Sequence, residues 1–277
     1  MAYFLAASLF VLTASLFCAA APSAISKNSG ALVFEDTFDG PLNTTKWRVQ
    51  EGVHLHGVYT ASNAFTANGA LVLRTLAHNQ TVGGVRYYVS SGAVDTSASL
   101  AQQFGAWEAR LRMPNVAATP GFRLHSSMWL VNQLPWVAAN GTACGAQRAP
   151  EVDLVEYDPV EWTRARTGAG PWAEGHFHAF FDNCTSRWAP YRYLRGGADA
   201  DFHTDFHVWR LEWAEGSLTM LVDGVALLAV TDAGWLRGLA APLYFLLTNA
   251  IMAPAPPSAA DVLPQEMVVD YVRAWAA

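Results

Sequence analysis

Long runs of basic residues are missing from this chain of 277 residues, and lysines are few. The formal net charge is −6 at pH 7, and charged residues make up 14% of the sequence. Proteins that bind nucleic acid or anionic membrane surfaces rely on clustered positive charge, so we expect neither partner. Because 52% of the residues are hydrophobic, the chain can bury the core of one large domain.

Cysteine is scarce too, with three residues in all. Residues 1–20 are typical of a signal peptide, because an apolar run at 5–17 precedes small residues. The usual Lys or Arg ahead of the apolar run is missing. An uncleaved membrane anchor is the alternative. Removal of this segment leaves Cys144 and Cys184, which we predict to form one disulfide rather than two buried free thiols. The segment predicts secretion, to the medium or the cell wall. Four N-glycosylation sequons agree with it, at Asn43, Asn79, Asn140 and Asn183.

Long helical patterns and internal repeats are absent after residue 20. Strand-like patterns recur between turn signals, at 70–76, 87–94, 107–113, 127–131, 152–157, 176–181, 208–213, 218–222, 225–230, 243–249 and 267–275. Asp223-Gly224 predicts a type I′ hairpin, and Ala214-Glu215-Gly216 a second hairpin turn. Many strands with Gly and Pro in the turns predict an all-β fold, a single β-sandwich or jelly-roll domain over residues 21–277.

Three carboxylates interrupt one apolar strand pattern, at Glu151, Asp153 and Glu156. Alternate side chains of a strand share a face, so Glu151 and Asp153 lie together, whereas Glu156 joins them only if a β-bulge adds one residue. Crowded acids are costly, and their split protonation is how glycosidases obtain an acid and a nucleophile at one pH. An exposed acidic strand of an ordinary sheet is the alternative.

Six further segments occur in the order found in glycoside hydrolase family 16, which the chain resembles. This resemblance implies a concanavalin-like β-jelly roll and a retaining endo-glycosidase that needs no cofactor for its chemistry. The segments are VFEDTFDG (33–40) followed by KW (46–47), NAFTANGALVL (63–73), SG (91–92), GAWEARLRMP (105–114), the stretch from DFH (205–207) to DG (223–224), and VDYVR (269–273).

The bulged spacing E-x-D-x-x-E resembles the endo-β-1,3-glucanase (laminarinase) branch and the red-algal polysaccharide hydrolases. The resemblance implies that Glu151 is the nucleophile, that Asp153 holds it and tunes its ionisation, and that Glu156 is the general acid/base. Retaining enzymes place two carboxyls ~5 Å apart, which one strand face allows. We therefore expect a secreted monomer acting on a polysaccharide, β-1,3- or mixed β-1,3/1,4-glucan. A transglycosylase with the same intermediate and a non-catalytic glycan-binding protein are the alternatives.

The chain departs from the family around its cleft. His125-Ser126 stand where the family usually has Trp-Pro, Ala93 stands where it often has Arg, and residues 148–150 lack the Trp often found there. The resemblance therefore supports the catalytic acids better than it supports any one substrate. His176 and His178 alternate on a strand, so they share a face and could bind sugar hydroxyls or be structural. A zinc site is not expected, because no third metal ligand lies at a characteristic distance from them in the sequence. Tryptophans stack on sugar rings or pack in the core, here at 129, 136, 162, 172 and 188. The predicted substrate-binding residues are Asn63, His125, Trp129, Trp136, His176 and His178.

One metal site also follows from the resemblance. The carboxylate of Asp270 would bind a structural calcium together with backbone oxygens of Thr37 and Gly69, since calcium prefers oxygen ligands. A strand-edge hydrogen bond of Asp270 is the alternative.

Overall fold

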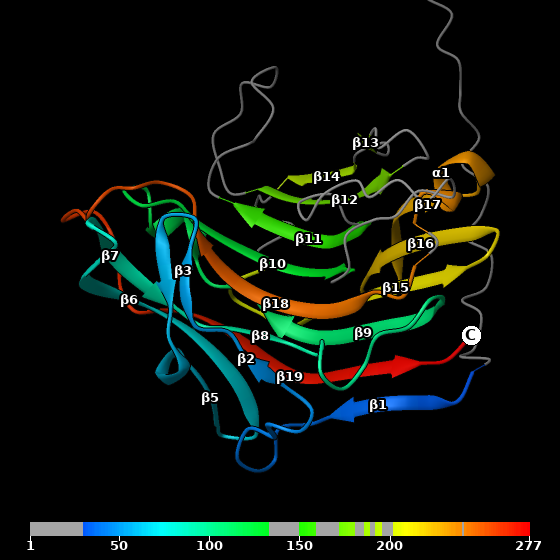
Figure 1. Cartoon of the computed structure of the whole chain (residues 1–277), viewed down its shortest axis with the longest axis horizontal. Coiled ribbons are helices and arrows are strands. Elements are labelled where there is room, and N and C mark those ends of the chain that lie inside the picture. Colours follow the sequence, from blue (N-terminus) through cyan, green and yellow to red (C-terminus); the bar gives the residue numbers. More distant parts are fainter. Residues whose placement is uncertain are drawn as a thin grey trace, which may run out of the picture.

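Two large β-sheets stacked on one another form this protein, seen here in a computed structural model (Figure 1). The structure describes residues 30–132, 150–158, 172–180, 186–188, 192–195, 202–239 and 241–277. Within these residues the elements are almost all strands, as predicted for a β-jelly roll. None of the helices among them is long and apolar enough to cross a membrane.

Eleven described strands form the first sheet, in the order β17-β16-β15-β9-β19-β6-β7-β4-β3, with β1 beside β19 and β5 beside β6. They pair mostly antiparallel, while β4 and β7 pair in parallel. Their bounds are β1 Leu32–Asp36, β3 Gly52–His54, β4 Gly57–Tyr59, β5 Ala64–Ala67, β6 Ala70–Val82, β7 Val85–Ser91, β9 Gly105–Arg112, β15 His207–Ala214, β16 Ser217–Val222, β17 Val225–Val230 and β19 Gln265–Trp275.

Eight described strands form the second sheet, in the order β13-β12-β11-β10-β18-β8-β2, with β14 beside β12. Their bounds are β2 Arg48–Val49, β8 Ala93–Asp95, β10 Leu124–Val131, β11 Glu151–Asp158, β12 Trp172–Phe180, β13 Ser186–Trp188, β14 Arg192–Arg195 and β18 Tyr244–Ile251. Two short 3₁₀ turns, Ala61–Asn63 and Val116–Ala118, lie between strands.

The core lies between the sheets and follows from strand alternation. In β10, Leu124, Met128 and Leu130 are fully buried, while the alternate residues His125, Ser127 and Trp129 face the other side of the sheet. Large aromatic side chains fill the space, and Trp107 stacks on Trp213 at a ring distance of 6.1 Å. Because these side chains occupy the inner faces, polar side chains of the second sheet gather on its outer face, where they form the site described below.

Both predicted hairpins are confirmed. Asp223 and Gly224 have φ angles of 48° and 76°, the positive values that a type I′ turn requires, and they join β16 to β17. Ala214 pairs with Ser217 across the turn between β15 and β16.

The pattern at 87–94 was predicted as one strand, and this is wrong. The chain passes at Gly92 from β7 in the first sheet to β8 in the second. A Cβ atom at Gly92 would lie 2.2 Å from the Asn63 carbonyl oxygen, so only glycine allows this close crossing.

A five-residue helix, α1 (Ala233–Arg237), was also missed by the sequence patterns. Asp232 caps it by accepting hydrogen bonds from the backbone N–H groups of Gly234 and Trp235. A helix of this length is too short to show apolar periodicity, so its cap was its only signal.

Candidate active site

A β-bulge in β11 brings the three predicted acids to one face, as the sequence predicted. On one side, Asp153 pairs with Trp129 and Val155 with the adjacent Met128, so β11 carries one residue more than β10. On the other side, β12 uses two steps where β11 uses three, between Asp153 and Glu156. Both bulge residues, Leu154 and Val155, turn into the core, and the next side chain, Glu156, returns to the outer face.

The acids line one cavity of about 230 Å³ on the outer face of the second sheet. Strand β10 contributes alternate side chains, β18 and the residue after it form the opposite wall, and the turn after β3 closes one end. The lining residues are Glu151, Asp153, Glu156, His125, Ser127, Trp129, Thr248, Ala250, Met252, His54 and Leu55.

The pKa of Glu151 is raised well above its ordinary value. Burial raises its pKa, the negative charge of Glu156 raises it further, and a hydrogen bond with Asp153 lowers it; the result is about 7. The charge of Glu156 thus acts on Glu151, and carboxyls that interact in this way titrate as a pair. Asp153 is 2% exposed and lies between them on the same face, where its bond favours the ionised form of Glu151.

His125 and Trp129 lie where the sequence placed them, on the cavity wall. His125 contacts Glu156, with 3.1 Å between Nε2 and Oε1. Trp129 is partly exposed toward the cavity, and its Nε1 donates to Thr248 Oγ1 at 3.1 Å, which fixes the indole across two strands. An indole held in this way offers a face on which a sugar ring can stack.

The assignment of Asn63 to substrate binding is wrong. Its side chain is 2% exposed, and its Nδ2 donates to Ser90 Oγ at 3.0 Å, within the packing beneath the first sheet. It is not among the residues that line the cavity. The family-like segment at 63–73 predicted where Asn63 lies in the chain but not that its side chain is buried. The backbone carbonyl of Asn63 packs against Gly92, where the chain crosses from one sheet to the other.

His176 and His178 belong to β12, whose backbone pairs with the acidic strand. His176 lies opposite Asp153 and His178 opposite Glu151. This register puts both positions beside the acids, while their side chains lie outside the described part of the structure. The other predicted residues outside the described part are residues 1–20, Trp136, Asn140, Cys144, Trp162, Asn183 and Cys184; of Trp172 and Trp188 only the strands are described.

Several cavity residues carried no sequence signal. His54 and Leu55 come from a strand pair about a hundred residues before the acids, and Thr248 and Ala250 from β18, about a hundred after them. Alternation showed which side chains of 243–249 share a face, but not that this strand pairs with β10. Asp158, the fourth acid of β11, was also missed; it is 2% exposed and bonds to His125.

The predicted calcium site stays a prediction, and the contact made by its side-chain ligand argues against it. Asp270 forms an ion pair with Arg110, with 2.7 Å between Nη1 and Oδ2, so a cation there would meet a guanidinium. Thr37 Oγ1 donates to Asp39 Oδ2 at 2.6 Å. In the part of the chain that the structure describes, no group of three or more His, Cys, Asp or Glu could hold a metal ion. The bond to Arg110 favours the alternative role for Asp270.

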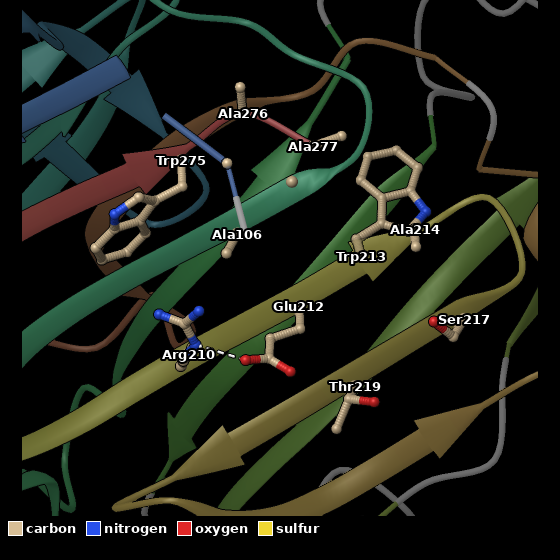
Figure 2. A pocket seen from close by; sticks show the side chains of 12 residues that line it. Ala106, Arg210, Glu212, Trp213, Ala214, Ser217, Thr219, Trp275, Ala276 and Ala277 are labelled. Atoms are coloured by element: carbon tan, nitrogen blue, oxygen red, sulfur yellow. Dashed lines mark hydrogen bonds and ion pairs between the residues drawn. The ribbon is translucent and has the colours of Figure 1, made fainter. Parts of the chain in front are cut away.

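A second cavity, of about 270 Å³, lies on the first sheet, away from the acids (Figure 2). Its acidic side chain, Glu212, accepts a hydrogen bond from Arg210 Nε at 2.9 Å, and the Arg210 guanidinium lies 5.0 Å from the Trp275 ring centre. A carboxylate neutralised by arginine, with no second acid beside it in this lining, cannot supply an acid and a nucleophile. The cavity of β11 is therefore the candidate active site.

Comparison with known proteins agrees with this fold. No protein-family model matches the sequence. Glucan endo-1,3-beta-glucosidase A1 of Niallia circulans is 24% identical over 276 residues, covering 88% of this chain and 37% of that protein, so the chain spans well under half of it. The laminarinase catalytic domain of Thermotoga maritima is 21% identical with a TM-score of 0.68, covering 90% of this chain and 98% of that one.

A non-specific endo-β-1,3(4)-glucanase of family GH16 is 23% identical with a TM-score of 0.68, covering 91% of this chain and 96% of that one. The match in sequence is to a glucanase, and the two solved structures share the fold of this chain. In sequence and in fold, this chain resembles the laminarinase-like members of glycoside hydrolase family 16.

Proposed function

We propose that this chain is a retaining endo-glycosidase that hydrolyses β-1,3-glucan or mixed β-1,3/1,4-glucan. The observation that carries the proposal is the bulge of β11, which presents Glu151, Asp153 and Glu156 to one cavity. The glucanases that the chain resembles support the choice of substrate class.

Each acid has a part in a double displacement. Glu151 attacks the anomeric carbon and forms a covalent glycosyl-enzyme, while Glu156 gives its proton to the departing glycosidic oxygen. Glu156 then takes a proton from water, which attacks the same carbon from the face that the leaving group vacated, and the bond between that carbon and Glu151 breaks to return the Glu151 carboxylate. Asp153, in its protonated form, donates a side-chain hydrogen bond to Glu151 and so favours the ionised, nucleophilic form of Glu151.

The proton count of the site suits this reaction. The coupled pair of Glu151 and Glu156 holds one proton below about pH 7, since burial and mutual repulsion keep both from ionising together. The first step needs one ionised and one protonated carboxyl. The proton reaches Glu156 by transfer from Glu151. The hydrogen bond from Asp153 favours this transfer because it stabilises the ionised form of Glu151.

The setting of the enzyme is part of the proposal. We infer a secreted monomer whose residues 1–20 are a signal peptide and whose Cys144 and Cys184 form a disulfide beside the cleft. Of the four sequons, Asn43 and Asn79 lie on exposed positions, which glycan attachment requires. Trp129 is the described aromatic that would stack on the sugar in the cavity.

The test is a measurement of reducing ends released from a panel of polymers: laminarin, mixed-linkage β-glucan, agar and carrageenan. We expect activity on the first two, and a loss on the order of a thousandfold in kcat in Glu151→Gln and Glu156→Gln. Glu212→Gln is the matched control, because it removes a carboxylate from the other cavity. Normal activity of Glu151→Gln, or no depolymerisation of any polymer, would overturn the proposal. Products longer than the starting oligomer would indicate transglycosylation.

A further inference from the structure

His125 lies between two acids of the neighbouring strand. Its Nε2 is 3.1 Å from Glu156 Oε1, and its Nδ1 is 3.1 Å from Asp158 Oδ2. The other oxygen of Asp158 accepts a hydrogen bond from Arg123 Nε at 3.0 Å. A chain of contacts therefore runs from Arg123 through Asp158 and His125 to Glu156.

This geometry sets the protonation of His125. Each ring nitrogen faces a carboxyl oxygen, and a nitrogen that donates to an accepting oxygen carries a proton, so donation to both oxygens makes the ring an imidazolium. Burial lowers the pKa of His125, but the charge of Glu156 and the hydrogen bonds to Asp158 and Glu156 outweigh burial and raise it to about 10. The side chains of His125 and Asp158 are 8% and 3% exposed, so water competes little for these contacts.

Among the described residues, His125 is the cationic side chain that contacts Glu156. On β11 the other groups around Glu156 are the acids Glu151, Asp153 and Asp158, and β18 presents the uncharged Thr248 and Ala250. His54 closes the cavity end, and both burial and the charge of His125 lower its pKa. Arg123 lies one contact further away, behind Asp158. On β12, Glu174 is opposite Glu156 in register, with its side chain outside the described part.

We propose that His125, held by Asp158 and Arg123, is a positioning residue for Glu156. It donates to Oε1, which leaves Oε2 to carry the proton that moves to the glycosidic oxygen, and its positive charge favours the loss of that proton. His125 keeps both of its own protons throughout. The inference rests on the proposed function and adds a residue that stands where the family has tryptophan.

Two consequences separate this role from simple packing. A neutral side chain at 125 makes Glu156 a weaker acid, so the cleavage of natural glycosidic bonds slows and the alkaline limb of the pH profile moves to higher pH. An activated aryl leaving group departs without a proton, so its release does not depend on the acidity of Glu156. A structural defect would slow both reactions alike.

The experiment compares kcat/KM against pH for His125→Gln on β-1,3-glucan and on a dinitrophenyl β-glycoside of a β-1,3-linked oligosaccharide. On the polymer we expect a loss of about 10- to 100-fold and an alkaline limb about one pH unit higher or more, and on the aryl glycoside a change of less than about threefold. Asp158→Asn should shift the limb in the same direction by less. His207→Gln is the matched control, because it removes another His–Asp contact, 2.6 Å between Nδ1 and Asp223 Oδ2, far from the cavity.

Equal losses on both substrates, or an unmoved alkaline limb in both variants, would overturn the role of His125. Nitrogen NMR of the unmodified protein tests the same point without turnover, and a neutral His125 at pH 8 would also overturn it. If the unmodified protein cleaves neither substrate, the proposed function fails instead. Near-ultraviolet circular dichroism shows which variants keep the native packing.

Discussion

Glu151→Gln should make the protein more stable while it removes activity. The carboxyl of Glu151 has its pKa raised from 4.5 to about 7, first by burial and then by the charge of Glu156. A carboxyl whose pKa is higher in the folded than in the unfolded state opposes folding once it ionises. Stability therefore falls as pH rises from about 4.5 to about 7, and the full penalty applies above pH 7.

The size of the effect follows from the shift. The difference between about 7 and 4.5 is 2.5 units, and at about 1.36 kcal/mol per unit this gives about 3 kcal/mol. Because the Glu151 side chain is partly exposed and the penalty is shared with Glu156, this is an upper limit. Gln keeps the shape of the side chain without its charge, so Glu151→Gln should gain about 1–3 kcal/mol over the unmodified protein at pH 8 and almost nothing at pH 4.

Urea unfolding at pH 4 and pH 8, followed by tryptophan fluorescence, measures both values. Glu212→Gln is again the control, since an arginine-paired carboxylate on the first sheet should change stability by less than about 1 kcal/mol, with a different dependence on pH. A Glu151→Gln protein that is less stable than the original at pH 8, or that gains as much at pH 4, would refute the reasoning. The result would then place the charged form of Glu151 in a favourable environment.

Two further predictions concern stereochemistry and crosslinking. Two carboxyls on one strand face suit retention, so early products seen by NMR should be β-anomers. For the same reason, azide should restore turnover of an activated aryl glycoside by Glu156→Ala, with a β-glycosyl azide as product. Initial release of the α-anomer would contradict this. Mass mapping without reduction should find a Cys144–Cys184 disulfide, which typically contributes about 2–4 kcal/mol; two free thiols would show that the prediction is wrong.

Local features of the fold could be predicted from the sequence because their causes are local. The type I′ turn at Asp223-Gly224 needs two residues that accept positive φ, and the chain supplies them side by side. The bulge in β11 follows from the spacing of Glu151, Asp153 and Glu156, since strand alternation leaves no other way to bring three acids to one face. The all-β fold follows from the same alternation, repeated along the chain.

Contacts between distant segments were decided by the tertiary structure. Strand alternation shows which face a side chain occupies but not which strand lies beside it, so the sequence could not place Thr248 or His54 in the cavity. The sequence offered His125 as a substrate ligand, and only the pairing of β10 with β11 put it between Glu156 and Asp158. Asn63, which the resemblance had suggested for sugar binding, is buried beside the crossing at Gly92. The sequence by itself thus predicted the three acids of one strand, while pairing between strands far apart in the chain determined the charges that surround them.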